Sequence, residues 1–137
     1  YEAARAEFTA DEADVYRQGK VLTVRLKGLA FPSAKSELRS LNYPLLTKVQ
    51  KVIQSFGPST VSVEGFTDSV GSKAKNEKLS MARAQSVSSY LIATATIDKA
   101  HISAVGKGYE KPLATNKSAA GKAQNRRVDI VITPQAL

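Results

Sequence analysis

Apolar and polar residues alternate in several short segments, a period of two that is typical of strands with one buried face. Residues 60–66 (T-V-S-V-E-G-F) and 127–133 (R-V-D-I-V-I-T) show the pattern most clearly. Residues 14–27 contain strand-forming residues on either side of Gln18-Gly19, a dipeptide suited to a hairpin turn. The alternation therefore predicts a strand pair near the N-terminus and two later strands.

One longer segment, residues 37–56, repeats its apolar residues at steps of three and four, which is typical of an amphipathic helix. We expect its regular part to begin near Pro44, because proline suits the first turn of a helix. A second helix is predicted to run to about Ala93, with Ser72 as a suitable N-cap. The sequence therefore predicts two helices that pack against a sheet.

The expected order is strand pair, helix, strand, helix, strand, loop and strand, the strand before the loop following a helical turn within residues 97–105. Strands connected through helices are usually parallel neighbours. We therefore predict an α+β fold with one mixed parallel/antiparallel sheet of about four strands. Helices should pack on one face of this sheet. In addition to the four strands, we expect an N-terminal hairpin strand or a helix tail. The domain is expected at residues 14–134, with a tail or the end of an upstream segment at 1–13 and a C-terminal tail at 135–137.

The chain length allows one well-buried core, because 137 residues are too few for two comfortable domains. No window approaches the roughly 20 consecutive apolar residues that span a bilayer as a helix. The chain begins with Tyr1 rather than Met, so we expect a fragment or a processed form from which an upstream targeting segment is missing.

The net charge of +8 is unevenly distributed, since residues 99–128 hold seven Lys and Arg residues against one acid, Glu110. Such an imbalance predicts attraction to a polyanion: a nucleic acid, an anionic membrane surface or an anionic cell-wall polymer. A role in solubility alone explains the charge equally well.

Several classes of chemistry are excluded by composition. The chain has no cysteine and a single histidine, His101, which excludes disulfides, thiolate nucleophiles, Cys-based or His-rich metal sites and most hydrolytic triads. Glu64 and Asp68 lie near one strand end, but Glu64 should point away from Asp68 or lie on the open face of the sheet. No glycine spacing matches a phosphate-binding loop. We therefore expect no enzyme, no cofactor and no metal.

The second predicted helix and the loop before it carry the most informative chemistry. Helical spacing places four residues within an arc of about 60°: Asn76, Ser80, Arg83 and Val87. The polar part of this stripe lies close to the loop with Asp68, which suggests a small pocket with one anionic and one cationic wall. Such a pocket suits a zwitterion, because Asp68 accepts from an ammonium while Arg83 holds a carboxylate. On spacing alone, an internal Asp68–Arg83 salt bridge is the favoured alternative.

Nucleic-acid binding by a basic module is the main rival interpretation. Sheets that bind RNA stack bases on exposed aromatic residues. The predicted strands offer only Tyr16 and Phe66 for this purpose. The strands therefore offer few aromatic residues on which bases could stack. The basic segment nevertheless keeps nucleic-acid binding open as an alternative.

Five ordered blocks resemble the OmpA-like C-terminal domain, which is shared by OmpA proteins, the peptidoglycan-associated lipoprotein and flagellar motor protein B. They are G-F-T-D-S-V-G at 65–71, N-E-K-L-S-M-A-R-A at 76–84, V-S-S-Y-L at 87–91, G-K-G-Y-E-K-P at 106–112 and N-R-R-V at 125–128. The resemblance implies non-covalent binding of peptidoglycan through the diaminopimelate of the stem peptide, and no nucleic acid. It also implies a periplasmic domain, attached to the outer membrane of a Gram-negative bacterium through a missing upstream segment.

The resemblance implies roles for individual residues. Asp68 matches the acid that takes the ligand's ammonium, and Arg83 matches the arginine that takes its carboxylate. Phe31 aligns with a loop whose backbone N–H groups meet ligand carboxylates. The remaining matched positions are Asn76, Leu79, Thr67, Ser72 and Arg126.

Three positions depart from the family pattern. Phe66 stands where the family usually has His, so that it should pack beneath the loop instead of donating a hydrogen bond. Pro32 replaces a frequent Asp and removes one backbone donor, and Lys122 replaces a frequent Arg. None of them alters Asp68 or Arg83, so we expect binding to persist.

Overall fold

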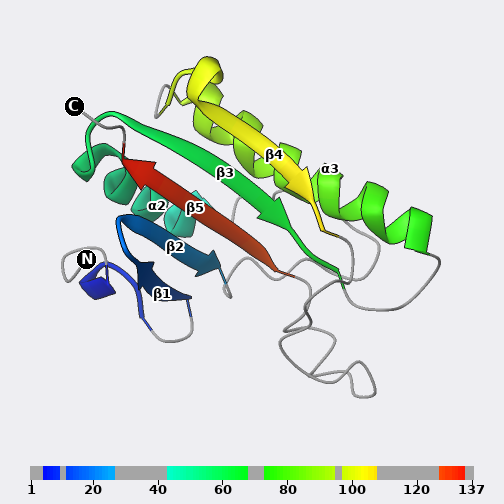
Figure 1. Cartoon of the computed structure of the whole chain (residues 1–137), viewed down its shortest axis with the longest axis horizontal. Helices are drawn as coiled ribbons and strands as arrows, with labels where there is room; N and C mark the ends of the chain where they lie inside the picture. Colours follow the sequence, from blue (N-terminus) through cyan, green and yellow to red (C-terminus); the bar gives the residue numbers. More distant parts are fainter. Residues whose placement is uncertain are drawn as a thin grey trace.

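The computed structural model describes residues 5–9, 12–26, 43–67, 73–94, 97–107 and 127–134. In this part of the chain, a five-stranded sheet carries two α-helices on one of its faces (Figure 1). The elements are β1 Ala13–Gln18, β2 Val21–Leu26, α2 Tyr43–Ser55, β3 Ser59–Gly65, α3 Lys73–Ala93, the short 3-10 helix η2 Lys99–His101, β4 Ile102–Gly106 and β5 Val128–Pro134.

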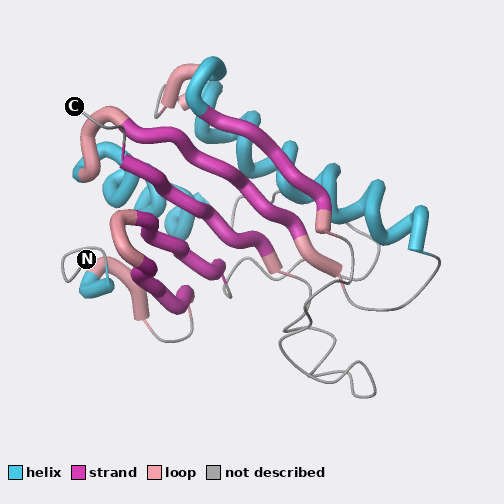
Figure 2. Tube along the Cα trace, in the orientation of Figure 1, coloured by secondary structure: helices cyan, strands magenta, loops and turns pink. Residues whose placement is uncertain are grey.

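The sheet is mixed, with strand order β1-β2-β5-β3-β4 (Figure 2). The strands on either side of α3, β3 and β4, are parallel neighbours, as their helical connection predicted. The last strand, β5, lies between β2 and β3 and is antiparallel to both. The predicted order of elements and the predicted α+β fold are confirmed.

The N-terminal hairpin is closed by Gly19 and Lys20, one residue later than the predicted dipeptide Gln18-Gly19. Gln18 pairs with Val21 across the turn, and Gly19 has a φ of 61°. Glycine adopts this left-handed conformation without the steric penalty of a side chain. The turn chemistry thus fixes the register of β1 on β2.

Helix α2 confirms the regular part of the first predicted helix, whereas residues 37–42 lie outside the described residues. Pro44 occupies the first turn, where its missing N–H removes no helical bond. Gly57 follows the helix with a φ of 68°, and its N–H donates to the carbonyl of Gln54 at 3.2 Å. This glycine supplies the C-terminal cap directly after residue 56, where the predicted helix ends.

The core lies between the helices and one face of the sheet. Inward residues of the central strands, such as Val24, Val63 and Ile130, are fully buried. Helix α2 contributes the apolar side chains Leu45, Leu46, Val49, Val52 and Ile53. Each buried aliphatic side chain contributes about 1.5–3 kcal/mol, so this layer holds both helices firmly against the strands.

Residues before β1 contact the same core. Phe8 is 9% exposed and belongs to the core cluster. Glu12 accepts a hydrogen bond from Lys48 of α2 at 2.6 Å. The start of the described chain is therefore packed on the domain by both an apolar and an ionic contact.

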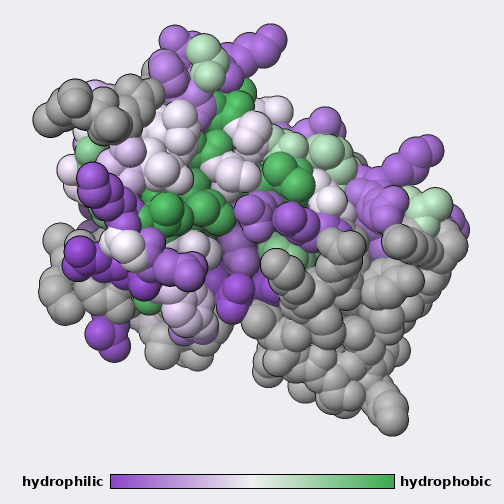
Figure 3. All heavy atoms as spheres, viewed as in Figure 1, coloured by the Kyte–Doolittle hydropathy of each residue, from purple (hydrophilic) through white to green (hydrophobic). Residues whose placement is uncertain are grey.

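The opposite face of the sheet is turned toward the viewer in Figure 3, where apolar side chains lie among neutral and polar ones. Part-exposed Thr23, Ser62 and Val131 belong to this face, since they alternate with the buried core residues. We call it the open face. Within the described residues, no helix is long and apolar enough to cross a membrane.

Candidate functional site

The first half of α3 lies unusually close to the ends of β3 and β4, and two glycines make this possible. A Cβ added to Gly65 would lie 2.0 Å from the carbonyl oxygen of Ser80. A Cβ added to Gly106 would lie 2.7 Å from the amide nitrogen of Met81 and 2.8 Å from Ser80 Oγ. Glycine in a strand often marks such a close approach. The polar part of α3 is thereby brought to the carboxyl ends of two parallel strands.

The predicted helical stripe faces inward along its whole length. Asn76 is 3% exposed, while Ser80, Arg83 and Val87 are fully buried. The hydroxyl of Ser80 donates to the carbonyl of Glu77 at 2.9 Å. The inward face of α3 therefore changes from polar to apolar along the helix, as the sequence indicated.

Arg83 is the largest fully buried side chain of the described residues. Its Nη1 donates to the backbone carbonyl of Phe66 at 3.3 Å. Phe66 directly precedes Thr67, at the start of the segment that leads to Asp68. Removing a guanidinium from water is costly unless its surroundings compensate the charge. The helix thus supplies a desolvated cation beside the strand end that leads to Asp68.

Two buried polar side chains lie near the same strand end. Thr67 is 2% exposed and Asn76 is 3% exposed. Thr67 Oγ1 and Asn76 Nδ2 have no hydrogen-bond partner among the described residues. A buried polar group left in this state costs about 1–3 kcal/mol. Both groups would gain from a polar molecule bound at this end of the sheet.

The structure brings together only part of the predicted site. Thr67 is buried just after β3, Asn76 and Arg83 are buried in the first turn and the middle of α3, and Leu79 is half-buried on the same helix. The remaining predicted positions lie outside the described residues: Asp68, Ser72, Arg126 and Phe31. Pro32 and Lys122 lie outside the described residues as well. The alternative salt bridge between Asp68 and Arg83 stays a prediction for the same reason.

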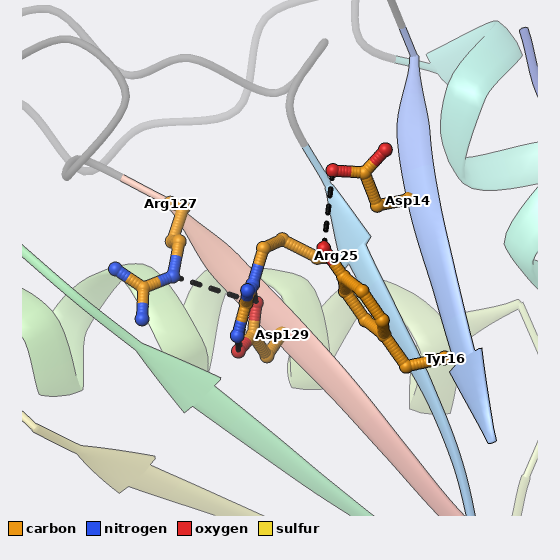
Figure 4. A network of polar contacts seen from close by, with 5 residues as sticks. All are labelled: Asp14, Tyr16, Arg25, Arg127 and Asp129. Atoms are coloured by element: carbon orange, nitrogen blue, oxygen red, sulfur yellow. Dashed lines mark hydrogen bonds and ion pairs between the residues drawn. The ribbon is translucent and has the colours of Figure 1, made fainter. Parts of the chain in front are cut away.

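A charged network on the open face was not predicted from the sequence (Figure 4). Arg25 of β2 donates to Asp129 of β5 through Nε at 3.1 Å and through Nη2 at 3.0 Å. Arg127 Nε lies 3.7 Å from Oδ1 of the same carboxylate. Strand alternation places Arg127 and Asp129 on one face, but only the register that pairs Arg25 with Asp129 reveals the network.

The network continues to the edge of the sheet on one side. The Arg25 guanidinium lies 5.1 Å from the ring centroid of Tyr16, whose hydroxyl donates to Asp14 at 3.3 Å. In the other direction, Glu64 pairs in register with Asp129, so Glu64 lies on the open face as expected. Across the four strands the row therefore reads acid, arginine, acid and acid, with two carboxylates as neighbours on β5 and β3.

Burial affects the pKa of both arginines in this network. Burial lowers the pKa of Arg127, and the nearby charge of Asp129 offsets only part of that effect. Burial also acts against the charge of Arg25, but the hydrogen bond and the charge of Asp129 outweigh it and raise its pKa. Arginine remains protonated in proteins, so both groups are cations at neutral pH. One carboxylate thus stabilises two positive charges.

Phe66 is held at the junction of the open-face network and the helix. It is 3% exposed, and the Arg127 guanidinium carbon lies 3.8 Å from its ring centroid. Because the ring is buried, Phe66 is not exposed for base stacking, which leaves Tyr16 as the exposed aromatic residue on the described strands. This arrangement weakens the nucleic-acid interpretation.

Two clefts lined by described residues lie apart from these side chains. One, of about 330 Å³, is lined by Ile53, Gln54, Gly57, Pro58, Ser59, Ile97 and His101. The other, of about 270 Å³, is lined by Arg17, Gly19, Lys20, Val21, Leu22, Phe56 and Pro134. Neither contains a predicted site residue. Among the described residues, no group of three or more His, Cys, Asp or Glu side chains could hold a metal ion.

Comparison with known proteins adds independent information on this arrangement. The probable lipoprotein YiaD of Escherichia coli is 38% identical, over 88% of this chain and 55% of its own length. The peptidoglycan-binding protein ArfA of Mycobacterium tuberculosis is 36% identical, over 76% of this chain and 32% of its own length. This chain therefore spans only about a half and a third of these two relatives.

A solved structure shares the fold. The cell wall anchor of the T6SS from Pseudomonas aeruginosa matches with a TM-score of 0.80 and 34% identity, covering 92% of this chain and 90% of that one. A sequence model described as the OmpA family matches residues 30–126. Since this match includes α2, β3, α3 and β4 and covers most of the sequence, the chain belongs to the OmpA family.

Proposed function

We propose that this domain binds peptidoglycan non-covalently through the diaminopimelate of the stem peptide. The observation that carries the proposal is the fully buried guanidinium of Arg83, next to the strand end that leads into Thr67 and Asp68. Family membership supports the wall as the partner, because one relative is named as a peptidoglycan-binding protein and a structural neighbour as a cell wall anchor.

Diaminopimelate ends in an ammonium and a carboxylate on one carbon, and the proposed site offers a group for each. Arg83 would hold the carboxylate in a bidentate fork, and Asp68 would accept from the ammonium. The buried hydroxyl of Thr67 and the amide of Asn76 would complete the hydrogen bonds. In surroundings of low dielectric these contacts are stronger than in water.

Other predicted residues would border this site. We assign Ser72 and Phe31 to polar contacts from the adjoining loops, Leu79 to an apolar contact and Arg126 to the rim. In this proposal the domain lies in the periplasm of a Gram-negative bacterium. It would anchor an outer-membrane or envelope protein to the wall through sequence upstream of the domain.

Two stem tripeptides that differ in one group test the proposal. One contains diaminopimelate, and the other contains lysine, which keeps the side-chain ammonium but lacks the terminal carboxylate. We expect calorimetry to show binding of the first and at least about tenfold weaker binding of the second, since a lost charge-assisted hydrogen bond costs about 1.5–3 kcal/mol. Equal affinity for both peptides would exclude the assigned role of Arg83.

Variants then locate the site on the chain. Asp68→Ala and Arg83→Ala should both lose binding to purified sacculi, and Ser103→Ala, an exposed position on β4, is the control. Circular dichroism must accompany the assay, because removing one partner of a buried charge can unfold the surrounding loop. If both variants keep a native spectrum and bind sacculi as the wild type does, the proposed site is wrong.

A further inference from the structure

We propose that Arg127 is a positioning residue for the ligand site, acting through Phe66 on the segment that carries Thr67 and Asp68. The inference rests on the proposed function and deepens it, because it assigns a role to an arginine outside the predicted contacts. It also gives a role in binding to the charged network on the open face.

Phe66 is held from three directions. Its carbonyl oxygen accepts from Arg83 Nη1 at 3.3 Å, on the side of α3. Its N–H donates to the backbone carbonyl of Arg127 at 2.8 Å, on the side of β5. Its ring packs against the Arg127 guanidinium at 3.8 Å from the centroid. The Phe66 residue is therefore held between two arginines, by its carbonyl on one side and by its N–H and ring on the other.

The position of Arg127 is in turn determined by the strands behind it. Asp129 lies 3.7 Å from Arg127 Nε and is held by hydrogen bonds from Nε and Nη2 of Arg25 (Figure 4). Arg127 is 3% exposed, so its guanidinium has little freedom to turn away from the ring. A cation–π contact removed from water in this way is stronger than an exposed one.

Such support matters because recognition of a zwitterion depends on the separation of the two charged groups. Arg83 stands on a rigid helix, whereas Asp68 follows the last described residue of the β3 end, Thr67. Binding groups need placement to within about 0.5 Å, so a loosely held strand end would weaken binding even with both charges present. By holding Phe66 in place, Arg127 would fix the position of the strand end that precedes Asp68.

The experiment combines peptide binding with amide hydrogen exchange in one set of variants. Arg127→Met removes the charge at similar length, and Arg127→Lys keeps the charge without the planar group. Arg17→Met is the matched control, since Arg17 is an exposed arginine that donates to Gly19 at the hairpin. The Lys107 amide, which donates to Gly65 at 2.9 Å, reports on the pairing of β3 with β4.

We expect Arg127→Met to weaken binding of the diaminopimelate tripeptide about tenfold and to speed exchange of the Phe66 amide, which donates to the Arg127 carbonyl, by a similar factor. Exchange at Lys107 should stay unchanged, Arg127→Lys should recover part of both effects, and Arg17→Met should match the wild type. In a Phe66→Leu background, Arg127→Met should weaken binding by no more than about twofold, because the ring through which it acts is gone.

Each contrary outcome is decisive. Wild-type binding by Arg127→Met, together with lost binding by Arg83→Ala, would refute the inference and leave the proposed function standing. A full tenfold loss in the Phe66→Leu background would mean that Arg127 touches the ligand itself, and accelerated exchange at Lys107 would mean a general structural role. Failure of the wild type to bind the tripeptide would overturn both proposals.

Discussion

At the scale of single residues, the fold depends on positions where a side chain is either absent or charged. Gly65 and Gly106 have no side chain where α3 meets two strand ends, and this lets Arg83 approach the sheet. Asp129 carries the charge that holds two arginines on the open face. Both kinds of position can be tested by one substitution each.

Gly65→Ala should destabilise the domain by about 1–3 kcal/mol, the usual cost of forcing atoms into a packed interior. The new Cβ would lie 2.0 Å from the Ser80 carbonyl oxygen, and that atom belongs to helix backbone that cannot turn aside. Urea unfolding measures the difference, with Ser103→Ala on β4 as the control. A Gly65→Ala variant as stable as the wild type would show that α3 does not lie this close.

Asp129→Ala should lower the free energy of unfolding by about 3 kcal/mol, because Arg25 and Arg127 would face each other without a carboxylate between them. The double variant Arg25→Met/Asp129→Val removes the pair together and should be more stable than Asp129→Ala. Chemical denaturation of the three proteins checks the order. Equal stability of the single variant and the wild type would contradict a structural role for this carboxylate.

At the scale of the element, α3 is one helix with two kinds of inward face. Its second half packs Val87 and Leu91 into the core, whereas its first half buries Asn76, Ser80 and Arg83 against the strand ends. The apolar half holds the helix in place, and the polar half presents the proposed binding groups. Stability and binding should therefore respond to different substitutions along the same helix.

Val87→Ala should cost about 2 kcal/mol of stability, since it leaves a small cavity in a closely packed core, and should leave the affinity for the tripeptide unchanged. Arg83→Met should cost about 1 kcal/mol or less, because an apolar side chain replaces a desolvated charge, and should remove binding. Unfolding curves and calorimetry on both variants measure the two effects. If Val87→Ala weakens binding as strongly as Arg83→Met does, the two halves of α3 do not have separate roles in stability and binding.

At the scale of the whole molecule, two contributions to binding should depend differently on salt. One is the long-range attraction due to the net charge of +8, and the other is ligand binding at the proposed buried site. Exposed charges attract an anionic wall over a distance of about 10 Å at 0.1 M salt, whereas buried charge pairs are screened much less. Binding to whole sacculi should weaken markedly between 0.05 and 0.5 M salt, on the order of tenfold, and binding of the tripeptide should change little. Co-sedimentation and calorimetry across this range measure both, and salt-independent binding to sacculi would leave solubility as the explanation of the charge.

Much of the molecule could be predicted from the sequence because its signals are local. Alternation located the strands, the three- and four-residue period located α2, the Ser72 N-cap signal located α3, and Gly19 lies in the hairpin turn. The buried polar stripe of α3 was likewise visible in the spacing of Asn76, Ser80 and Arg83. These features depend on residues a few positions apart, which is the range that periodicity reports.

The remaining features depend on contacts between residues far apart in the chain, and only the folded arrangement reveals them. The pairing of β5 between β2 and β3 brings Arg25 opposite Asp129, 104 positions later, and brings Arg127 over Phe66. The close approach of α3 likewise joins Gly65 and Gly106 to one helix. Local patterning was thus enough to identify the elements and the polar face. Strand order and register decided which charges meet, because cross-strand contacts have no signature in the spacing along a single segment.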